Sequence, residues 1–347
     1  MTVSLRSPQV AQDFLRLDLQ LGTLAALAGK RLFITGGTGF FGRWLLAALA
    51  ALNERGVPVC VDVLSRDPEA FLAREPGYRG VSWLRLIQGD VTTLAPGAAR
   101  YDYVIHAATD TAPAAQADKP QLYEQIVDGA RRVLAFASAS GAQRILLTGS
   151  GAQYGRQPDD IDSFAENCGL ACDPCDPDSA YGEAKRAAEM LAVLHAQVSG
   201  LEPVFARCFA FAGPGLPFDG HFAIGNFIRD ALYRREITVL ADREVWRSYL
   251  YGADLAIWLL VLLLRGEAGQ AYNVGSHEFV TLQALAGRIG ALLAPAKPVR
   301  LTAIEEGVGR SRYLPDTRRA ATLGLVAWTS LDAIITHTAC WAGEPDR

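Results

Sequence analysis

Residues 32–42 read LFITGGTGFFG. A short apolar segment runs into three spaced glycines, Gly36, Gly39 and Gly42, and the helical sequence 43–52 follows at once. Glycines at this spacing allow a tight turn, a close approach of backbone to a ligand, and close packing of a helix on a strand. The stretch therefore predicts a strand, a phosphate-binding turn and a helix whose N-terminal N–H groups face a dinucleotide.

After this turn, short apolar segments alternate with Ala- and Leu-rich segments of helical spacing. The predicted strands are 31–35, 59–64, 84–88, 103–106, 145–148 and 204–209. The predicted helices include 43–54, 122–140 and 180–198. Strands separated by helices predict an α/β fold with a doubly wound parallel (Rossmann) sheet.

The regular alternation weakens after Pro214, which predicts a smaller C-terminal substrate-binding lobe. The predicted division is a lead-in helix at 1–29, a dinucleotide-binding domain at 30–210 to which 252–280 return, and the substrate-binding lobe at 211–251 and 281–347. The expected apolar face of the lead-in helix consists of Phe14, Leu15, Leu17, Leu19 and Leu21.

The composition of the 347 residues, half of them hydrophobic with a net charge of −4, supports a large core and gives no basic footprint for nucleic acid. The longest apolar run, 255–264, is about half the length that crosses a bilayer, so it predicts a buried helix. Residues 1–20 lack the pattern of a secretory signal. We expect a soluble cytoplasmic enzyme with a small-molecule substrate, and neither nucleic acid nor membrane as partner.

Tyr181 and Lys185 lie four residues apart in a predicted helix, so their side chains share one face. A lysine cation one turn away, helped by the positive nicotinamide ring, favours a phenolate and moves the pKa of the tyrosine toward neutrality. The phenolate can then take a hydroxyl proton while hydride leaves the same carbon for a nicotinamide. Taken alone, such a pair is more often an exposed pair on an ordinary helix.

Several motifs together resemble the extended short-chain dehydrogenases/reductases in order and spacing. They occupy residues 35–42, 89–91, 106–108, 154–155, 181–185, 213–214 and 272–275. Within that superfamily the chain resembles the nucleotide-sugar epimerase/dehydratase branch over residues 30–342. The resemblance implies an NAD(P)-dependent enzyme for a nucleotide-linked sugar, and a homodimer formed through helices 122–140 and 180–198.

The resemblance also implies roles for single residues. Ser150 stands where the family carries the hydroxyl that hydrogen-bonds the reacting oxygen, so the expected catalytic set is Tyr181, Lys185 and Ser150. The expected cofactor-binding residues are Gly36, Gly39, Phe40, Phe41, Gly42, Ser65, Arg66, Asp90, Val91, Ala107, Ala108, Thr109, Tyr181, Lys185 and Cys208.

The substrate side is expected to involve Ser150, Asn226, Arg247, His221 and Arg312. Arg247 matches the arginine that family members use on the nucleotide diphosphate, to which a planar guanidinium is suited. A turn serine at 150, a loop cap at 226 and a surface imidazole at 221 are the alternative interpretations.

The second predicted strand bears on the choice between NADP and NAD. An acidic residue at its end would bind a ribose 2′-hydroxyl, whereas Ser65 and Arg66 suit a 2′-phosphate. This favours NADP. If the strand ended two residues earlier, Asp62 would hold the ribose and the cofactor would be NAD. Simple solvation of Arg66 at the surface is a further alternative.

The reaction is narrowed by a departure from the family. Its 4,6-dehydratases place an Asp–Glu pair directly after the hydroxyl residue, whereas this chain has Gly151 and Ala152. Elimination of water then lacks its acid and base. We therefore expect an epimerase or a 4-ketoreductase. A dehydratase with other acids, a reductase of a non-sugar carbonyl and a non-catalytic dinucleotide-binding sensor are the alternatives.

Cys168, Cys172 and Cys175 have a spacing that could serve an iron–sulfur cluster or zinc. They fall in a Pro- and Asp-rich loop before Tyr181, and the glycine turn already assigns the fold to a different cofactor. We interpret the cluster as incidental and expect no metal.

Overall fold

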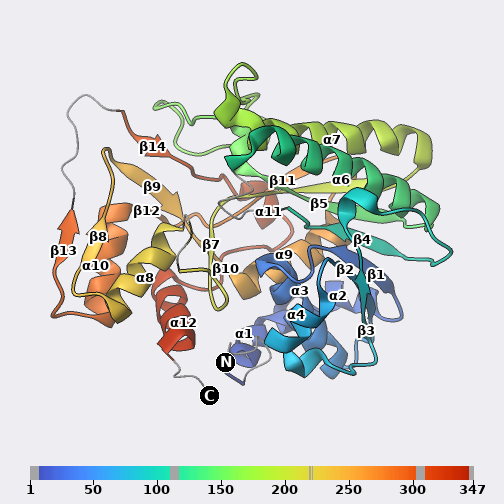
Figure 1. The fold of residues 1–347 in the computed structure, drawn as a ribbon, viewed down its shortest axis with the longest axis horizontal. Coiled ribbons are helices and arrows are strands. Elements are labelled where there is room, and N and C mark those ends of the chain that lie inside the picture. Colours follow the sequence, from blue (N-terminus) through green and yellow to red (C-terminus); the bar gives the residue numbers. More distant parts are fainter. Residues whose placement is uncertain (1–7, 110–116, 219, 221, 302–308, 344–347) are drawn as a thin grey trace.

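A computed structural model describes residues 8–109, 117–218, 220, 222–301 and 309–343. Its centre is a seven-stranded parallel sheet in the order β11-β6-β5-β4-β1-β2-β3, shown in Figure 1. The strands are β1 (Arg31–Thr35), β2 (Cys60–Ser65), β3 (Leu84–Gln88), β4 (Tyr103–His106), β5 (Arg144–Ser150), β6 (Glu202–Cys208) and β11 (Ala271–Val274). The predicted strands are present and the predicted fold class is confirmed.

Alternation along β1 builds a core on each face of the sheet. Leu32 and Ile34 belong to the cluster of α3 (Phe40–Glu54) and α9 (Gly252–Arg265), whereas Phe33 belongs to the cluster of α6 (Lys119–Ala139). The two sets of helices therefore cover opposite faces.

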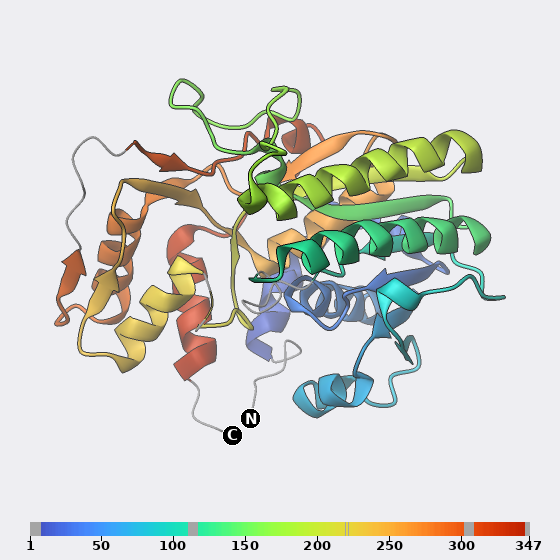
Figure 2. The same ribbon diagram turned by 45° about the horizontal axis from the view of Figure 1, so that its top comes forward.

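Figure 2 shows α6 lying beside α7 (Ala180–Ser199). The apolar run predicted to be a buried helix is α9, in which residues 252–263 are all buried. No helix in the described part of the chain has the length and apolar character needed to span a membrane.

The order of the strands also locates a binding crevice. From β1 the chain proceeds through β2 and β3 on one side and through β4, β5 and β6 on the other. Ligands of such sheets bind beyond the carboxyl ends of the strands, where the order reverses. The glycine turn follows β1 and segment 107–109 follows β4, so both lie where the strand order reverses.

A smaller group of elements gathers to one side of the sheet (Figure 1). Its helices are α8 (Ala223–Tyr233), α10 (Leu282–Leu293) and α12 (Leu331–Gly343). Its strands form the sheets β12-β9-β14 and β13-β8, from β8 (Ile237–Val239), β9 (Val245–Ser248), β12 (Phe279–Thr281), β13 (Val299–Leu301) and β14 (Ser311–Arg312). The short pair β7 (Phe211–Ala212) and β10 (Leu250–Tyr251) forms a further sheet. Two further short helices, which are not part of this group, are α4 (Pro68–Arg74) and α11 (Arg318–Ala321).

The N-terminal segment is not the single amphipathic helix that was predicted. It is a series of short segments: α1 (Pro8–Asp13), the 3-10 helix η1 (Phe14–Gln20), α2 (Leu21–Leu24) and the 3-10 turn η2 (Ala25–Leu27). Phe14 and Leu17 are buried, whereas Leu15 and Leu19 are exposed. The physical reason is the three-residue repeat of a 3-10 helix, which places residues i and i+3 on one side.

Candidate active site

The turn after β1 has the geometry of a phosphate-binding loop. Gly36 has a φ of +73°, a conformation that strains other residues. A Cβ on Gly36 would lie 2.4 Å from the carbonyl oxygen of Ala107, and one on Gly42 would lie 2.2 Å from the Cα of Gly37. A Cβ on Gly39 would have no neighbour closer than 3.5 Å, although Gly39 lines the cavity described next. The turn therefore fits a pyrophosphate at the N-terminus of α3.

A cavity of about 1980 Å³ extends from this turn to the smaller lobe. It exceeds the roughly 300–1,000 Å³ of most small-ligand sites, which leaves room for a dinucleotide and a second ligand. The predicted residues on its wall are Gly36, Gly39, Phe40, Phe41, Ser65, Arg66, Asp90, Val91, Ala107, Ala108, Thr109, Ser150, Tyr181, Lys185, Cys208, Asn226 and Arg247. Gly42 is absent from this wall and packs against Gly36 and Gly37 of the turn. His221 lies outside the described residues.

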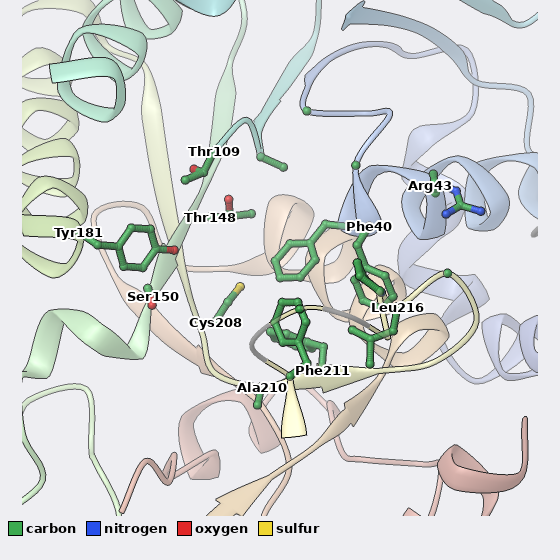
Figure 3. Close-up of a pocket in the computed structure, with 18 of the residues that line it drawn as sticks. Phe40, Arg43, Thr109, Thr148, Ser150, Tyr181, Cys208, Ala210, Phe211 and Leu216 are labelled. Carbon is green, nitrogen blue, oxygen red and sulfur yellow. The ribbon is translucent and has the colours of Figure 1, made fainter. Parts of the chain in front are cut away.

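Lys185 is fixed at one end of the cavity. Its Nζ donates to Thr109 Oγ1 at 2.6 Å and to the Thr148 carbonyl at 2.9 Å. Burial lowers the pKa of Lys185 to about 8. Figure 3 shows Thr109, Thr148, Ser150 and the hydroxyl of Tyr181 around the same part of the cavity. The helix that carries residues 181 and 185 thus brings a phenol and an amine to one place.

Burial is the main influence on the pKa of Tyr181. Burial raises it to about 12, and the main opposing influence is a hydrogen bond with Ser150. The Lys185 ammonium lies 5.9 Å from the centre of the Tyr181 ring. Burial thus outweighs the attraction of the Lys185 cation at that distance, and the lowering predicted for Lys185 together with a positive nicotinamide ring stays a prediction.

Ser150 has a hydroxyl neighbour that the sequence reasoning missed. Its Oγ accepts from the backbone N–H of Ala152 at 3.1 Å and lies 3.3 Å from the Tyr313 hydroxyl. Tyr313 lines the cavity and donates to the Cys208 carbonyl at 3.3 Å. Ser150 is thus a member of a network of hydroxyl groups.

Arg312, which was predicted to bind the substrate, does not face the cavity. Arg312 is within 3.4 Å of the carbonyl oxygens of Asp159 and Ile161 and 3.8 Å from the carboxylate of Asp162, and it is absent from the cavity wall. The structure therefore does not bring Arg312 to the cavity. Neighbouring residues of an extended chain project to opposite sides, so the residue at the site is Tyr313.

Arg247 does reach the cavity. Its Nη1 donates to the Trp246 carbonyl at 2.8 Å, and its guanidinium carbon lies 5.9 Å from the centre of the Tyr313 ring. No carboxylate of the described residues forms an ion pair with it. Burial lowers the pKa of Arg247. A half-buried cation that lines a cavity without an acidic partner among the described residues is suited to bind an anion.

Asn226 lies on the wall and also stabilises the loop before α8. Its amide donates to the Gly220 carbonyl at 3.2 Å, and its Oδ1 is 3.4 Å from Arg229 Nη1. The loop contacts predicted as the alternative are thus present at a residue that faces the cavity.

With this geometry in place, comparison with known proteins identifies the family. Residues 32–275 match the NAD dependent epimerase/dehydratase family. The chain belongs to this family. The predicted membership in the extended short-chain dehydrogenases/reductases is confirmed, and the chain is an enzyme of an NAD-dependent type.

Relatives within the family carry out several reactions. UDP-glucuronic acid decarboxylase 6 of Arabidopsis thaliana is 28% identical over 294 residues, which cover 84% of this chain and 82% of that protein. A dTDP-glucose 4,6-dehydratase structure from Streptomyces venezuelae, with NAD and TYD bound, is 25% identical, has a TM-score of 0.76 and covers 90% of this chain and 97% of its own. The structure of UDP-glucose 4-epimerase from Thermotoga maritima, with UDP-glucose, has a TM-score of 0.74 at 20% identity and covers 90% and 98%. The family therefore fixes a nucleotide-sugar type of enzyme but leaves the reaction open.

The surroundings of Asp62 bear on the predicted alternative in which this residue binds the adenosine ribose of NAD. β2 extends to Ser65, and Asp62 lies buried in mid-strand. Asp62 accepts hydrogen bonds from Arg31, Arg85 and Tyr101 at 2.7, 2.6 and 2.6 Å. Although burial opposes its ionisation, these bonds hold the pKa of Asp62 below its ordinary value. The alternative in which Asp62 binds a ribose is therefore wrong.

The glycine that follows Ser150 also has a structural reason. A Cβ on Gly151 would lie 2.6 Å from the Phe209 ring. A larger side chain at 151 would require that ring to move. The position at which the family's dehydratases carry their first carboxylate is closed here by packing.

The cysteine cluster does not converge on a metal site. Cys172 is buried and its thiol donates to the Ala152 carbonyl at 2.8 Å, while Cys175 is exposed and Cys168 is half-buried. Across the described ranges, no group of three or more His, Cys, Asp or Glu residues is arranged to hold a metal ion. The contact of Cys172 instead ties the loop to the segment after Ser150.

Proposed function

We propose that this enzyme is an epimerase or 4-ketoreductase of a nucleotide-linked sugar. The observation that carries the proposal is the half-buried Tyr181 phenol, which interacts with Ser150 and lies beside Lys185 in a cavity that continues to Arg247. The phenol would act on the sugar while the guanidinium binds the diphosphate. The nucleotide sugars in the names of the relatives support this class of substrate.

The residues divide the chemistry as follows. A bound nicotinamide would supply or accept hydride at the reacting carbon, with Lys185 and Thr109 at its ribose. Tyr181 gives a proton to the oxygen on that carbon or takes one from it, and Ser150 hydrogen-bonds the same oxygen. With a pKa of about 12, the phenol is protonated at neutral pH, which is the form that a ketone requires. In the opposite direction, a positive charge bound beside the phenol favours its ionisation.

The carboxylates on the cavity wall support an epimerase or reductase over an eliminating enzyme. Asp90 accepts from Thr92, Asp230 pairs with Arg229 at 2.8 Å, and Glu236 pairs with Arg300 at 3.2 Å. Each of these described carboxylates is engaged, and positions 151 and 152 supply none. Acid–base elimination of water would need such a group.

We propose NADP as the preferred cofactor. Ser65 and Arg66 line the cavity where β2 ends. Asp67 caps α4 through a backbone N–H, and it is absent from the wall. Hydrogen bonds from Thr92 and, less strongly, the charge of Arg66 hold the pKa of Asp90 low. A hydroxyl and a guanidinium at the end of β2 suit a 2′-phosphate.

Arg66→Ala is expected to lower affinity for NADP by roughly 10- to 100-fold, the size of a lost charged hydrogen bond, and to leave NAD affinity nearly unchanged. Isothermal titration with both dinucleotides measures this. Arg79→Ala is the control, because Arg79 is exposed and pairs with Glu69 outside the cavity. Tighter binding of NAD than NADP by the unaltered protein would contradict the proposal.

We also propose a homodimer that forms through α6 and α7. Met190, Leu194 and Val198 recur every four residues on α7 and are 58%, 53% and 86% exposed. Such an apolar stripe is typical of an interface. Light scattering should give the mass of two chains, and Leu194→Glu should reduce it to one. A single-chain mass for the unaltered protein at micromolar concentration would refute the dimer.

The experiment that tests the function measures cofactor stoichiometry with a panel of UDP- and dTDP-linked sugars and 4-keto sugars. An epimerase converts its substrate without net change of absorbance at 340 nm, whereas a reductase consumes one reduced dinucleotide per product. Formation of a dehydrated or decarboxylated sugar as the main product would exclude both proposed reactions.

A further inference from the structure

Tyr313 is a second phenol in the site; it is half-buried and comes from the smaller lobe directly after β14. The Tyr313 ring lies against the Phe209 ring, with 4.7 Å between the ring centres. The guanidinium carbon of Arg247 lies 5.9 Å from the centre of the Tyr313 ring. Contacts with both a ring and a cation fix the position of the phenol and leave its O–H free to rotate.

The hydroxyl of Tyr313 has two acceptors within equal reach. It lies 3.3 Å from Ser150 Oγ and 3.3 Å from the carbonyl oxygen of Cys208. The carbonyl can only accept, whereas the serine hydroxyl can donate or accept. Burial raises the pKa of Tyr313, so this hydroxyl keeps its proton and can offer it to either neighbour.

We propose that Tyr313 is a positioning residue that sets the direction of the Ser150 hydroxyl and thereby supports ionisation of Tyr181. This inference rests on the proposed function, in which Tyr181 exchanges a proton with the substrate. Nothing in the sequence motifs marks Tyr313 for this role, and the distances to Ser150 and Cys208 carry it.

Two arrangements of the same protons follow from the geometry. When Tyr181 is neutral, it donates to Ser150, Ser150 donates to Tyr313, and Tyr313 donates to the Cys208 carbonyl. When Tyr181 is ionised, Tyr313 turns to donate to Ser150, and Ser150 donates to the phenolate. Both hydroxyls rotate and no O–H bond of Ser150 or Tyr313 breaks, so the protons balance.

The effect of Tyr313 depends on the other hydrogen bonds that the Ser150 hydroxyl accepts. The other protein donor to its Oγ is the backbone N–H of Ala152, at 3.1 Å. In the ionised arrangement, Tyr313 adds a second donor, which strengthens the bond that Ser150 makes to the phenolate. Loss of the Tyr313 hydroxyl should therefore make Tyr181 harder to ionise.

The test is the titration of Tyr181 by NMR in the full chain, labelled with ring ¹³C at the phenolic carbon of tyrosine and saturated with oxidised NADP. Tyr181→Phe assigns the resonance. Tyr313→Phe, which keeps the ring and its contacts, should raise the pKa of Tyr181 by about 0.5–1 unit, the size of one hydrogen bond. Tyr233→Phe is the control, because Tyr233 is exposed and bonds the Ala342 carbonyl.

A double-variant cycle separates this role from a structural one. In a Ser150→Ala background, Tyr313→Phe should leave the pKa of Tyr181 unchanged, because the intermediary is gone. An equal pKa in Tyr313→Phe and the unaltered protein, or an undiminished shift without Ser150, would overturn the inference while leaving the proposed function in place. Failure of Tyr181 to titrate below pH about 11 in the unaltered complex would overturn both, since a bound cation should lower its pKa.

Discussion

Tyr181→Phe is expected to reduce turnover of the nucleotide sugar by about 10²- to 10⁴-fold, the usual contribution of a general acid or base. The variant keeps the ring and its packing on α7 and loses only the hydroxyl, which interacts with Ser150. Dinucleotide affinity should stay within a few-fold of the unaltered protein, because the glycine turn and Lys185 remain. Steady-state turnover and titration with dinucleotide provide the two measurements.

The matched control for this variant is Tyr233→Phe, which removes an exposed hydroxyl from α8. It should retain full turnover. A Tyr181→Phe enzyme with more than a tenth of the original turnover would show that another group moves the proton. A loss of activity in Tyr181→Phe alone would reject the alternative of a non-catalytic sensor.

Gly36→Ala is expected to destabilise the protein by about 2–3 kcal/mol and to weaken dinucleotide binding roughly 10- to 100-fold. Two effects combine at this residue. Its φ of +73° strains an alanine, and the added Cβ would lie 2.4 Å from the Ala107 carbonyl oxygen. Relief of that clash separates β1 from the segment after β4, and the turn loses its shape.

Gly287→Ala is the matched control, measured by the same denaturant titration. Gly287 is an exposed residue inside α10, and a Cβ there would meet no atom within 4 Å. Alanine should stabilise this helix by about 0.5–1 kcal/mol. If Gly36→Ala matched Gly287→Ala in stability and dinucleotide binding, the account of the turn would be wrong.

Local patterns made the larger elements predictable. β1, the glycine turn and α3 follow each other without a break, so apolar spacing and three glycines are enough to define them. The Tyr181 and Lys185 pair is likewise a matter of one helical turn. These features depend on neighbours in the sequence, and the structure places them where the sequence predicted.

Features that depend on distant contacts were not predictable. Arg312 and Tyr313 are adjacent, and only the path of the chain after β14 decides that the phenol faces Ser150. The raised pKa of Tyr181 follows from burial, which no spacing of residues reveals. Asp62 could have bound a ligand until Arg85 and Tyr101 were seen to enclose it.

The prediction of the reaction involved both a feature visible in the sequence and a contact visible only in the structure. The absence of carboxylates at Gly151 and Ala152 was visible in the sequence, and it argued against elimination. Its reason is tertiary, because the Phe209 ring of the segment after β6 occupies the space that a side chain at 151 would need. Sequence showed which chemistry was missing, and packing shows why it cannot easily be restored.

The most direct test of the central claim is a crystal structure of the enzyme with oxidised NADP and UDP, in which the distance from the Tyr181 hydroxyl to the hydride-carrying carbon of the nicotinamide is measured. Both atoms must reach one sugar carbon and its oxygen, which limits their separation to roughly 5 Å. We expect a distance near this value, with the pyrophosphate on the turn of residues 36–42. A nicotinamide bound well beyond that reach of the phenol would contradict the account.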